Sequence, residues 1–170
     1  MAESSSNSES LQLFVVDSLA EQSGLICKWI IDSGALSLMS CHRNWFHTYR
    51  EISPPKKVWL GDDRYILAKG IGQLHLEMDL GRGRKGLTII RSAYYVPNVS
   101  SNLLSVSYLL KRGFSVNFNN NKCRIFCNKD QELCGIAKEV DGLFILNAKP
   151  VIQECAYISL TTRKLSEDSD

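Results

Sequence analysis

The strict alternation of polar and apolar side chains over residues 73–80 constrains the fold of this chain more than any other feature. A side-chain period of two places every second residue on the same face of a strand. The segment therefore predicts a half-buried strand, which needs further strands beside it. The apolar face consists of Leu74, Leu76, Met78 and Leu80, and the polar face consists of Gln73, His75, Glu77 and Asp79.

Short strand signals separated by turn residues recur along most of the chain. One helix is predicted over 102–112, with candidate N-caps in Ser100–Asn102 and a stop at Lys111-Arg112-Gly113. Pro54-Pro55 is expected to exclude regular structure at that point. Many short strands and a single helix in the C-terminal half predict a mainly β fold, a compact β-barrel. The other expected strands are 11–16, 25–31, 58–60, 65–68, 87–96, 114–118, 123–127, 133–137 and 143–146.

The length of 170 residues suits one domain that is large enough to bury a hydrophobic core. Residues 1–24 are rich in Ser, Glu and Asn at their start, and they are predicted to form a disordered or weakly ordered lead-in with one possible strand. The β-barrel domain is expected over residues 25–149. Residues 150–170 are interpreted as a tail of uncertain structure.

The charge balance argues against a dedicated nucleic-acid or membrane binder. The chain has 20 Lys and Arg against 18 Asp and Glu, a formal net charge of +2, and a basic face should show in such totals. The basic tip Arg82, Arg84 and Lys85 has no interleaved aromatic residues and is interpreted as a solvated turn, so nucleic acid is not an expected partner. The sequence shows no secretory signal and no apolar stretch of the length of a membrane span. A cytoplasmic or nuclear chain without a membrane partner is predicted.

The six cysteines are expected to be reduced thiols. Cys123 and Cys127 alternate with Arg124 and Phe126, which places both thiols on one strand face. The spacing of these two residues and Cys134 fits no zinc pattern. Buried core thiols are therefore predicted, with no metal site and no cofactor.

A single acidic loop follows the apolar run Trp29-Ile30-Ile31. Its residues are Asp32-Ser33-Gly34, followed by Ala35. A buried strand that ends in this way presents a carboxylate, while the hydroxyl residue braces the loop and glycine lets the backbone turn close to a ligand. Asp-Ser-Gly is also a common turn sequence, so an ordinary structural turn is the alternative. Because the chain contains only one such loop, a mechanism with two carboxylates needs two copies of the chain.

Taken in order, the motifs resemble the protease domain of copia-type LTR retrotransposon Pol polyproteins, a branch of the retropepsins. The resemblance runs from about residue 27 to residue 146. It implies a retropepsin-like closed β-barrel and an aspartic endopeptidase that hydrolyses peptide bonds in the Gag-Pol polyprotein as a homodimer, without a cofactor. The matching motifs are Trp29–Ala35, Trp45-Phe46 with Tyr49, Val58–Asp62, Gly70–Gly72, Tyr95–Pro97, Asn102–Ser107 and Gly142–Leu146.

The resemblance also implies roles for the matching residues. Asp32 would be the catalytic aspartate, and the Ser33 hydroxyl would bond across the dimer to hold two loops coplanar. Gly70-Ile71-Gly72 resembles a flap, the mobile hairpin that closes over a bound peptide. Asn102-Leu103-Leu104 resembles the run that enters the helix beside the active loop. Together with Asp32, the active-site loop would comprise Ser33, Gly34 and Ala35.

Leu36 and Leu38 depart from the family pattern. Active copia-type elements usually continue after Asp-Ser-Gly-Ala with a small hydroxyl residue and then a histidine. Neither position transfers a proton in the general aspartic mechanism, so these departures do not exclude catalysis. That mechanism predicts an acidic to near-neutral pH optimum for activity. The alternative hypothesis is a catalytically inactive, retroelement-derived β-barrel that acts as a binding or remnant domain.

Overall fold

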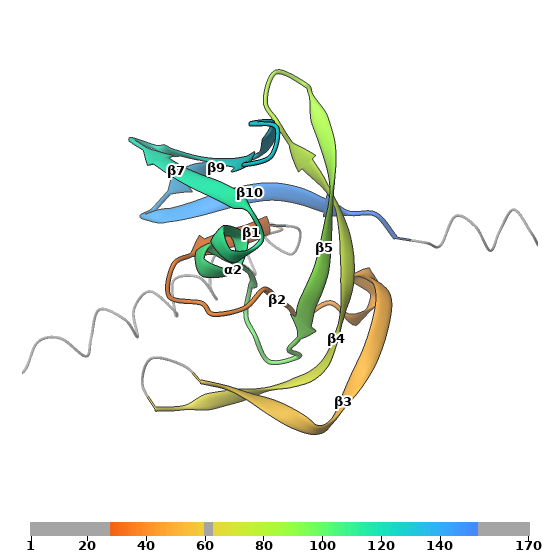
Figure 1. Cartoon of the computed structure of the whole chain (residues 1–170). Helices are drawn as coiled ribbons and strands as arrows, with labels where there is room; N and C mark the ends of the chain where they lie inside the picture. The colour runs from red at the N-terminus through yellow and green to blue at the C-terminus, as the bar shows by residue number, and fades with distance from the viewer. Residues whose placement is uncertain (1–27, 60–62, 153–170) are drawn as a thin grey trace, which may run out of the picture.

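The computed structural model describes residues 28–59 and 63–152, which form a mainly β chain (Figure 1). For these residues, the prediction of a mainly β fold with one α-helix in the C-terminal half is confirmed. The predicted lead-in over 1–24 and residues 153–170 of the predicted tail lie outside them. The elements are β1 (Lys28–Asp32), β2 (Met39–Ser40), the 3₁₀ helix η2 (Arg43–Trp45), β3 (Phe46–Trp59), β4 (Tyr65–Asp79), β5 (Lys85–Tyr95), β6 (Asn102–Ser105), α2 (Val106–Lys111), β7 (Phe114–Asn119), β8 (Lys122–Cys127), β9 (Leu133–Val140) and β10 (Leu143–Pro150).

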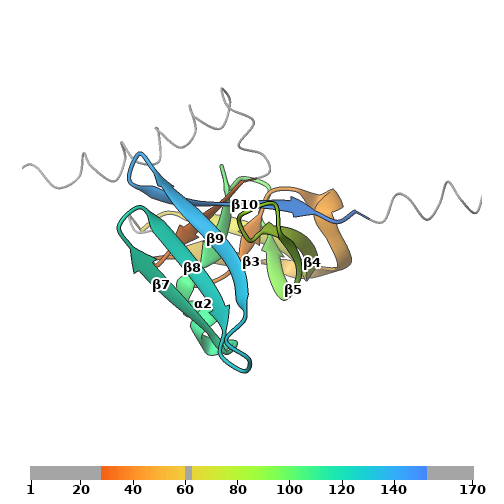
Figure 2. The same ribbon diagram turned by 90° about the horizontal axis from the view of Figure 1, so that it is seen from above.

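All the described strands belong to one sheet with the order β3-β4-β5-β2-β6-β1-β10-β9-β8-β7. A further antiparallel pairing joins β10 to β4, from Ala148↔Met78 to Pro150↔Leu76. The strands β4, β5, β2, β6, β1 and β10 therefore follow one another in a ring of paired strands, and β9, β8 and β7 extend the sheet beyond β10 (Figure 2). Within this ring, β1 lies between β6, which is parallel to it, and β10, which is antiparallel.

Residues 73–79 of the predicted alternation form the C-terminal part of β4, and Leu80 directly follows the strand. Leu74 and Leu76 are fully buried and Met78 is 3% exposed, while Asp79 is exposed. The apolar face of β4 thereby fills the main core, which draws on strands from both ends of the described chain. Other buried members of this core are Trp29, Ile31, Leu38, Trp45, Phe46, Ile90, Leu104, Leu109, Ile125 and Leu146.

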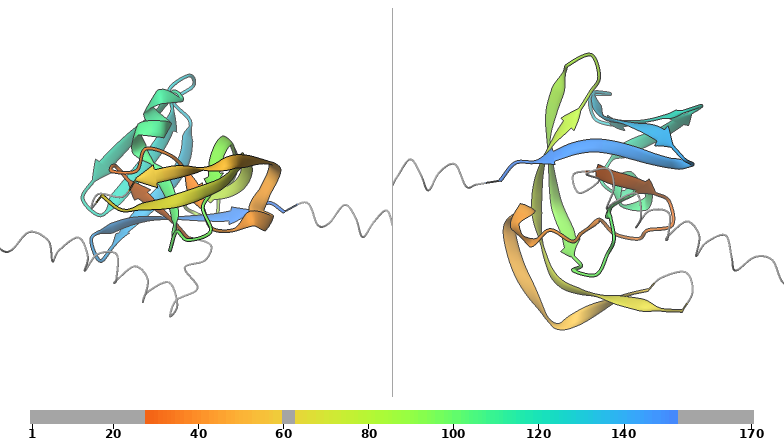
Figure 3. Two further views of the ribbon diagram at one scale, coloured as in Figure 1. Left: turned by 90° about the horizontal axis from the view of Figure 1, so that it is seen from below. Right: turned by 180° about the vertical axis from the view of Figure 1, so that it is seen from behind.

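The strands β3 and β4 form a long, bent hairpin. Its far half, which we call the arm (residues 56–59 and 65–68), runs along the bottom of the molecule in Figure 1, and Figure 3 shows the same bend from two further sides. The expectation that Pro54-Pro55 excludes regular structure is wrong, since β3 passes through both prolines. A strand at the edge of a sheet has an unpaired side where a missing N–H costs no ladder bond, and the pairing of β3 with β4 shifts register between Glu51 and Lys56.

The helix begins later than its sequence predicts. Residues 102–105 form β6, which pairs in parallel with Trp29–Asp32 of β1. The N-cap is Ser105, whose side chain accepts a hydrogen bond from the Tyr108 N–H. The predicted N-caps in Ser100–Asn102 are therefore wrong, because pairing with a distant strand overrides the local helix preference of the leucines.

The four cysteines in the described part of the chain are free thiols. Cys123 is fully buried, as predicted, and burial raises the pKa of its thiol to about 11. Cys127 and Cys134 are only partly buried. Among the residues that the structure describes, no helix has the length and apolar character needed to cross a membrane.

Two histidines stack on the β3–β4 hairpin, with the ring centroids of His47 and His75 3.9 Å apart. Burial, and then the charge of His47, lower the pKa of His75. As the pH falls through the ordinary value of about 6.5, the unfolded chain therefore takes up a proton before the folded chain does, and stability falls. We expect His75→Gln to flatten the decline in the urea midpoint between about pH 7 and pH 5. An unchanged pH dependence in the variant would contradict this assignment.

Candidate active site

The strand β1 carries Asp32 from the core to the surface. Trp29, Ile30 and Ile31 are buried, Asp32 is half-buried, and Ser33 and Gly34 are exposed. Because β1 is held by a paired strand on each side, its last residue has a fixed position while its side chain remains accessible. This arrangement meets the prediction of a buried approach that ends in an exposed acidic turn.

The backbone of the loop fixes one oxygen of the carboxylate. The Gly34 N–H donates a hydrogen bond to Asp32 Oδ1 over 2.7 Å, which closes a turn across Ser33. A Cβ atom at position 34 would lie 3.3 Å from the same oxygen. Glycine thus keeps the space beside the carboxylate open, in agreement with its predicted part in the turn.

Ser105, which the sequence alone did not indicate as a site residue, stabilises the Asp32 loop through a hydrogen bond. Ser105 lies opposite Asp32 in the parallel β1–β6 pair, and its Oγ donates to the Ala35 carbonyl over 2.5 Å. The same oxygen accepts from the Tyr108 N–H over 3.1 Å, so it ties the Asp32 loop to the first turn of α2. A serine at the start of an apolar run is a typical helix cap, but its contact with Ala35 depends on a strand pair far apart in sequence.

We expect Ser105→Ala to reduce the free energy of unfolding by about 1–2 kcal/mol. The change removes the cap of α2 and leaves the buried Ala35 carbonyl without its serine donor. Urea denaturation followed by tryptophan fluorescence measures the loss. Ser107→Ala is the matched control, because its hydroxyl contacts Ser105 Oγ but caps nothing, and an equal loss in both variants would contradict the assignment.

A second polar contact holds the strands around the loop together. Ser40 Oγ donates to Asn102 Oδ1 over 2.7 Å, and Asn102 Nδ2 donates to the Lys28 carbonyl over 3.1 Å. Ser40 and Asn102 are both almost completely buried. The hydrogen bonds link β2, β6 and β1 and satisfy side chains that would otherwise destabilise the interior.

The arm of the β3–β4 hairpin packs against the Asp32 loop. Ala35 and Met39 belong to a small apolar cluster with Ala68 of β4, and Val58 and Ile66 of the arm pack onto it. The arm also presents exposed aromatic rings, since Trp59 and Tyr65 are 64% and 45% exposed and lie edge to face with centroids 5.4 Å apart. A hairpin with apolar side chains on one face and aromatic rings on the other therefore lies beside the acidic turn.

The segment Gly70-Ile71-Gly72 does not form the hairpin that its resemblance to a flap implies. It lies inside β4 and is paired on both sides, with Glu51, Arg50 and Tyr49 of β3 and with Tyr95, Tyr94 and Ala93 of β5. The glycines are needed for close contact. A Cβ at Gly70 would lie 2.2 Å from the Tyr49 ring, and a Cβ at Gly72 would lie 1.9 Å from the Thr48 carbonyl oxygen. The segment is the bend of the hairpin, and the arm lies beyond it.

The two leucines that depart from the family pattern occupy opposite environments. Leu36 is 82% exposed immediately after the Asp32 loop, whereas Leu38 has no exposed surface and belongs to the main core. Leu38 therefore acts as a packing residue. Leu36 places an aliphatic side chain in solvent next to the carboxylate. Among the residues that the structure describes, no three His, Cys, Asp or Glu side chains gather as ligands for a metal ion.

Comparison with known families gives one match, to the family described as the beta-barrel domain of Pol polyproteins, over residues 29–114. The matched region begins in β1 and ends just after α2, and it includes the Asp32 loop, the arm and Ser105. No curated protein and no solved structure matched the chain. The match bears out the predicted origin in a retroelement Pol polyprotein. Because it spans half of the sequence, the chain belongs to the Pol polyprotein beta-barrel domain family.

Proposed function

We propose that the chain is an aspartic endopeptidase of a copia-type retrotransposon, which cleaves the Gag-Pol polyprotein as a homodimer with one Asp32 per chain. The observation that carries the proposal is the accessible carboxylate at the end of a buried strand, fixed by the Gly34 N–H. The ring of paired strands and the single helix support a retropepsin-like closed barrel as its scaffold. The Ser105 brace supplies the rigidity that such a site requires.

The proposed chemistry needs the carboxylates of two chains about 3 Å apart, where they share one proton because both cannot ionise cheaply. The ionised Asp32 takes a proton from a water molecule held between the pair, and that water attacks the scissile carbonyl carbon. The protonated Asp32 of the second chain donates a hydrogen bond to the carbonyl oxygen and stabilises the tetrahedral state. A mechanism with one aspartate per chain therefore ties activity to dimer concentration.

The proposed substrate is an extended peptide that lies between the Asp32 loop and the arm. Extended peptides bind sheets by pairing with strand edges, and β3, which forms one side of the arm, is an edge strand. Val58 and Ile66 offer apolar contacts on the inner face of the arm. This placement assigns the covering role to the arm in place of Gly70–Gly72.

The proposal is tested with extended peptide libraries from acidic to neutral pH, with cleavage products identified by mass spectrometry. We expect the cleavage rate to rise with the dimer fraction measured by sedimentation equilibrium. We also expect a peptide with a hydroxyl group on a tetrahedral carbon at the scissile position to inhibit cleavage. A protein that remains monomeric at every concentration, with all peptides intact, would overturn the proposal.

A non-catalytic peptide-binding domain is the second candidate, and the exposed Leu36 favours it. An aliphatic side chain in solvent beside the site suits apolar contact with a partner. One experiment distinguishes the protease from the binding domain. Saturable peptide binding in calorimetry, without any product after prolonged incubation, supports the binding domain and excludes the protease.

A further inference from the structure

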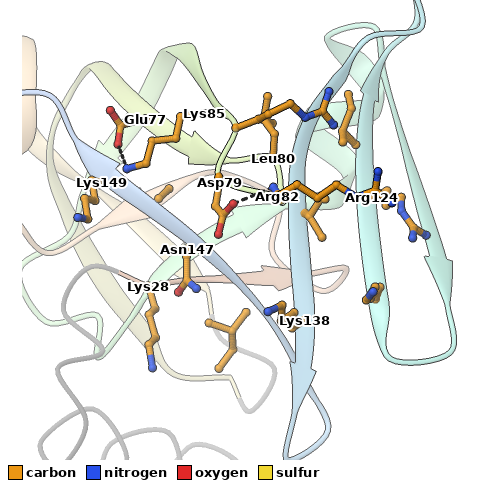
Figure 4. A pocket seen from close by; sticks show the side chains of 18 residues that line it. Lys28, Glu77, Asp79, Leu80, Arg82, Lys85, Arg124, Lys138, Asn147 and Lys149 are labelled. Carbon is orange, nitrogen blue, oxygen red and sulfur yellow. Dashed lines mark hydrogen bonds and ion pairs between the residues drawn. The ribbon is translucent and has the colours of Figure 1, made fainter.

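A groove of about 1190 Å³ lies at the other end of β1 from Asp32, between the tip of the β4–β5 hairpin and the strands β8, β9 and β10 (Figure 4). Eight of its lining residues are cationic and two are acidic. The cations come from five different places in the chain. They are Lys28, Arg82, Arg84, Lys85, Lys122, Arg124, Lys138 and Lys149, and the acids are Glu77 and Asp79.

The fold brings together positively charged side chains whose clustering cannot be seen from the overall composition. The whole chain has a formal net charge of only +2, whereas the eight cations and two acids that line the groove give it a formal charge of +6. By itself, the Arg82–Lys85 tip resembles a solvated turn, but the opposite wall of the groove adds cations from β8 and β9 (Figure 4). Lys149 of β10 lies on the side of the hairpin, directly opposite Glu77 of β4 in the β4–β10 pair. A concave surface of one sign focuses the electrostatic field and attracts ligands of the opposite charge.

Neighbouring acids neutralise little of this charge. Glu77 forms an ion pair with Lys85, and it raises the pKa of that lysine. Asp79 Oδ1 accepts the Gly81 N–H over 2.8 Å and so helps to fix the hairpin tip. No other lysine or arginine of the groove has an ion-pair partner in residues 28–59 and 63–152.

One cross-strand pair in the groove is electrostatically unfavourable. Lys122 of β8 and Lys138 of β9 are direct cross-strand partners. Like charges at directly opposite positions destabilise a sheet. A bound anion between the two lysines would reduce this repulsion.

We propose that this groove binds the phosphodiester backbone of a nucleic acid. Cations on both walls suit a linear ligand with a negative charge at every repeat, and the guanidinium groups of Arg82, Arg84 and Arg124 can engage phosphates through two N–H donors at once. The lining contains no aromatic side chain; its apolar residues include Leu80, Leu133, Ile136 and Ile145. Without aromatic rings the lining offers no platform for base stacking, so we expect phosphate contacts to supply most of the affinity, and such contacts carry no sequence information.

This inference does not rest on the proposed protease activity. Lys28 and Asp32 are the two ends of β1, and the β4–β5 tip and the arm lie at opposite ends of the molecule in Figure 1. Lys122, Arg124, Lys138 and Lys149 also lie beyond the residues that match the Pol family. A protein without protease activity can therefore still bind nucleic acid, and the reverse also holds.

The test is fluorescence anisotropy with labelled RNA and DNA single strands of about 20 nucleotides, over about 50 to 200 mM salt. We expect log K to fall linearly with log salt, by about 0.7 for each phosphate neutralised. RNA and DNA of one length, in mixed or uniform sequence, should differ little in affinity. Binding that is absent at the lowest salt concentration, or that polyglutamate of equal length displaces equally well, overturns the proposal.

Two charge reversals examine the two walls of the groove separately. Arg84→Glu changes the hairpin tip and Lys138→Glu changes β9, and each should weaken binding about tenfold and reduce the salt slope by about 1. Arg91→Glu is the control with an equal change in net charge, since Arg91 is exposed on β5 outside the groove. An equal loss in the control, or an effect on only one wall, contradicts a groove.

For Lys138→Glu, a loss of affinity can be distinguished from a loss of folding. Lys138→Glu places a carboxylate opposite Lys122, so a repulsive cross-strand pair becomes an attractive one. We therefore expect the thermal midpoint of this variant to stay constant or rise while its affinity for nucleic acid falls. A lower midpoint together with unchanged affinity would contradict both the role of the pair and the site.

Discussion

Replacing Asp32 with Asn is expected to reduce peptide cleavage by at least about 10³-fold, because a dyad without ionisable carboxyl groups has neither a base for water nor an acid for the carbonyl oxygen. The fold should persist. An Asn side-chain oxygen can still accept the Gly34 N–H that Asp32 Oδ1 accepts now. Measurements of kcat/KM and of the urea midpoint on the same preparations separate the loss of chemistry from a loss of structure.

The matched control is Asp141→Asn, which removes an equal charge from an exposed turn. Residue 141 has a φ of 51°, a conformation that asparagine adopts readily. Unchanged cleavage in this variant, with loss in the first, assigns the activity to Asp32. Full activity of Asp32→Asn would exclude the aspartic mechanism outright.

Mixed dimers give a further result for the same substitution. If each active site uses one carboxylate from each of two chains, an inactive chain inactivates the partner with which it pairs. Adding excess Asp32→Asn protein to the native protein should therefore reduce the activity of the native chains. A constant activity per native chain would show that one chain is sufficient and would contradict the shared site.

The second large effect is expected for Gly72→Ala, which should reduce the free energy of unfolding by about 3 kcal/mol or more. The added Cβ would lie 1.9 Å from the Thr48 carbonyl oxygen and 2.8 Å from its carbon. Those are backbone atoms of the paired strand, and they cannot move away without breaking the pairing of Tyr49 with Gly72. Urea denaturation monitored by circular dichroism measures the loss.

Gly86→Ala is the control for this prediction. Its Cβ would lie 3.1 Å from Leu80 Cδ1, the end of a flexible side chain that can rotate away. We expect a change of less than about 1 kcal/mol for it. Equal effects of the two substitutions would mean that glycine serves chain flexibility at both sites and not the close approach of β3 to β4.

The parts of the fold that depend on local pattern were predictable from the sequence. The alternation over residues 73–80 determines which face of β4 is buried, because period two is a property of one strand alone. The Trp29–Ile31 run likewise predicts a buried strand that ends at Asp32. Both are confirmed by the burial of their side chains.

The parts that depend on distant partners were not predictable. Asn102–Ser105 has the composition of a helix start but pairs with β1, some seventy residues earlier in the chain. Gly70 and Gly72 resemble a mobile loop, yet the need for glycine comes from the approach of Thr48 and Tyr49. In each case a neighbour that is remote in sequence decides the conformation, and no local pattern contains it.

For the same reason, the basic groove could not be predicted from the sequence. Arg82, Arg84 and Lys85 are close together in the chain, but the other cations of the groove come from β1 and from three strands that follow the helix. The net charge of the whole chain adds these cations to acidic residues elsewhere in the sequence, so it does not reveal the groove. The pairing of β10 with β4 and the contacts of β9 with β4 and β5 bring these elements together.

The packing of the arm has a consequence for selectivity. A molecule that enters between the arm and the acidic turn must first displace Val58 and Ile66 from the small apolar cluster that contains Ala35 and Met39. Each newly wetted aliphatic side chain costs up to about 1.5–3 kcal/mol, and only an occupant that covers the same surface recovers this energy. We therefore expect peptides with branched aliphatic residues near their midpoint to bind in preference to charged ones.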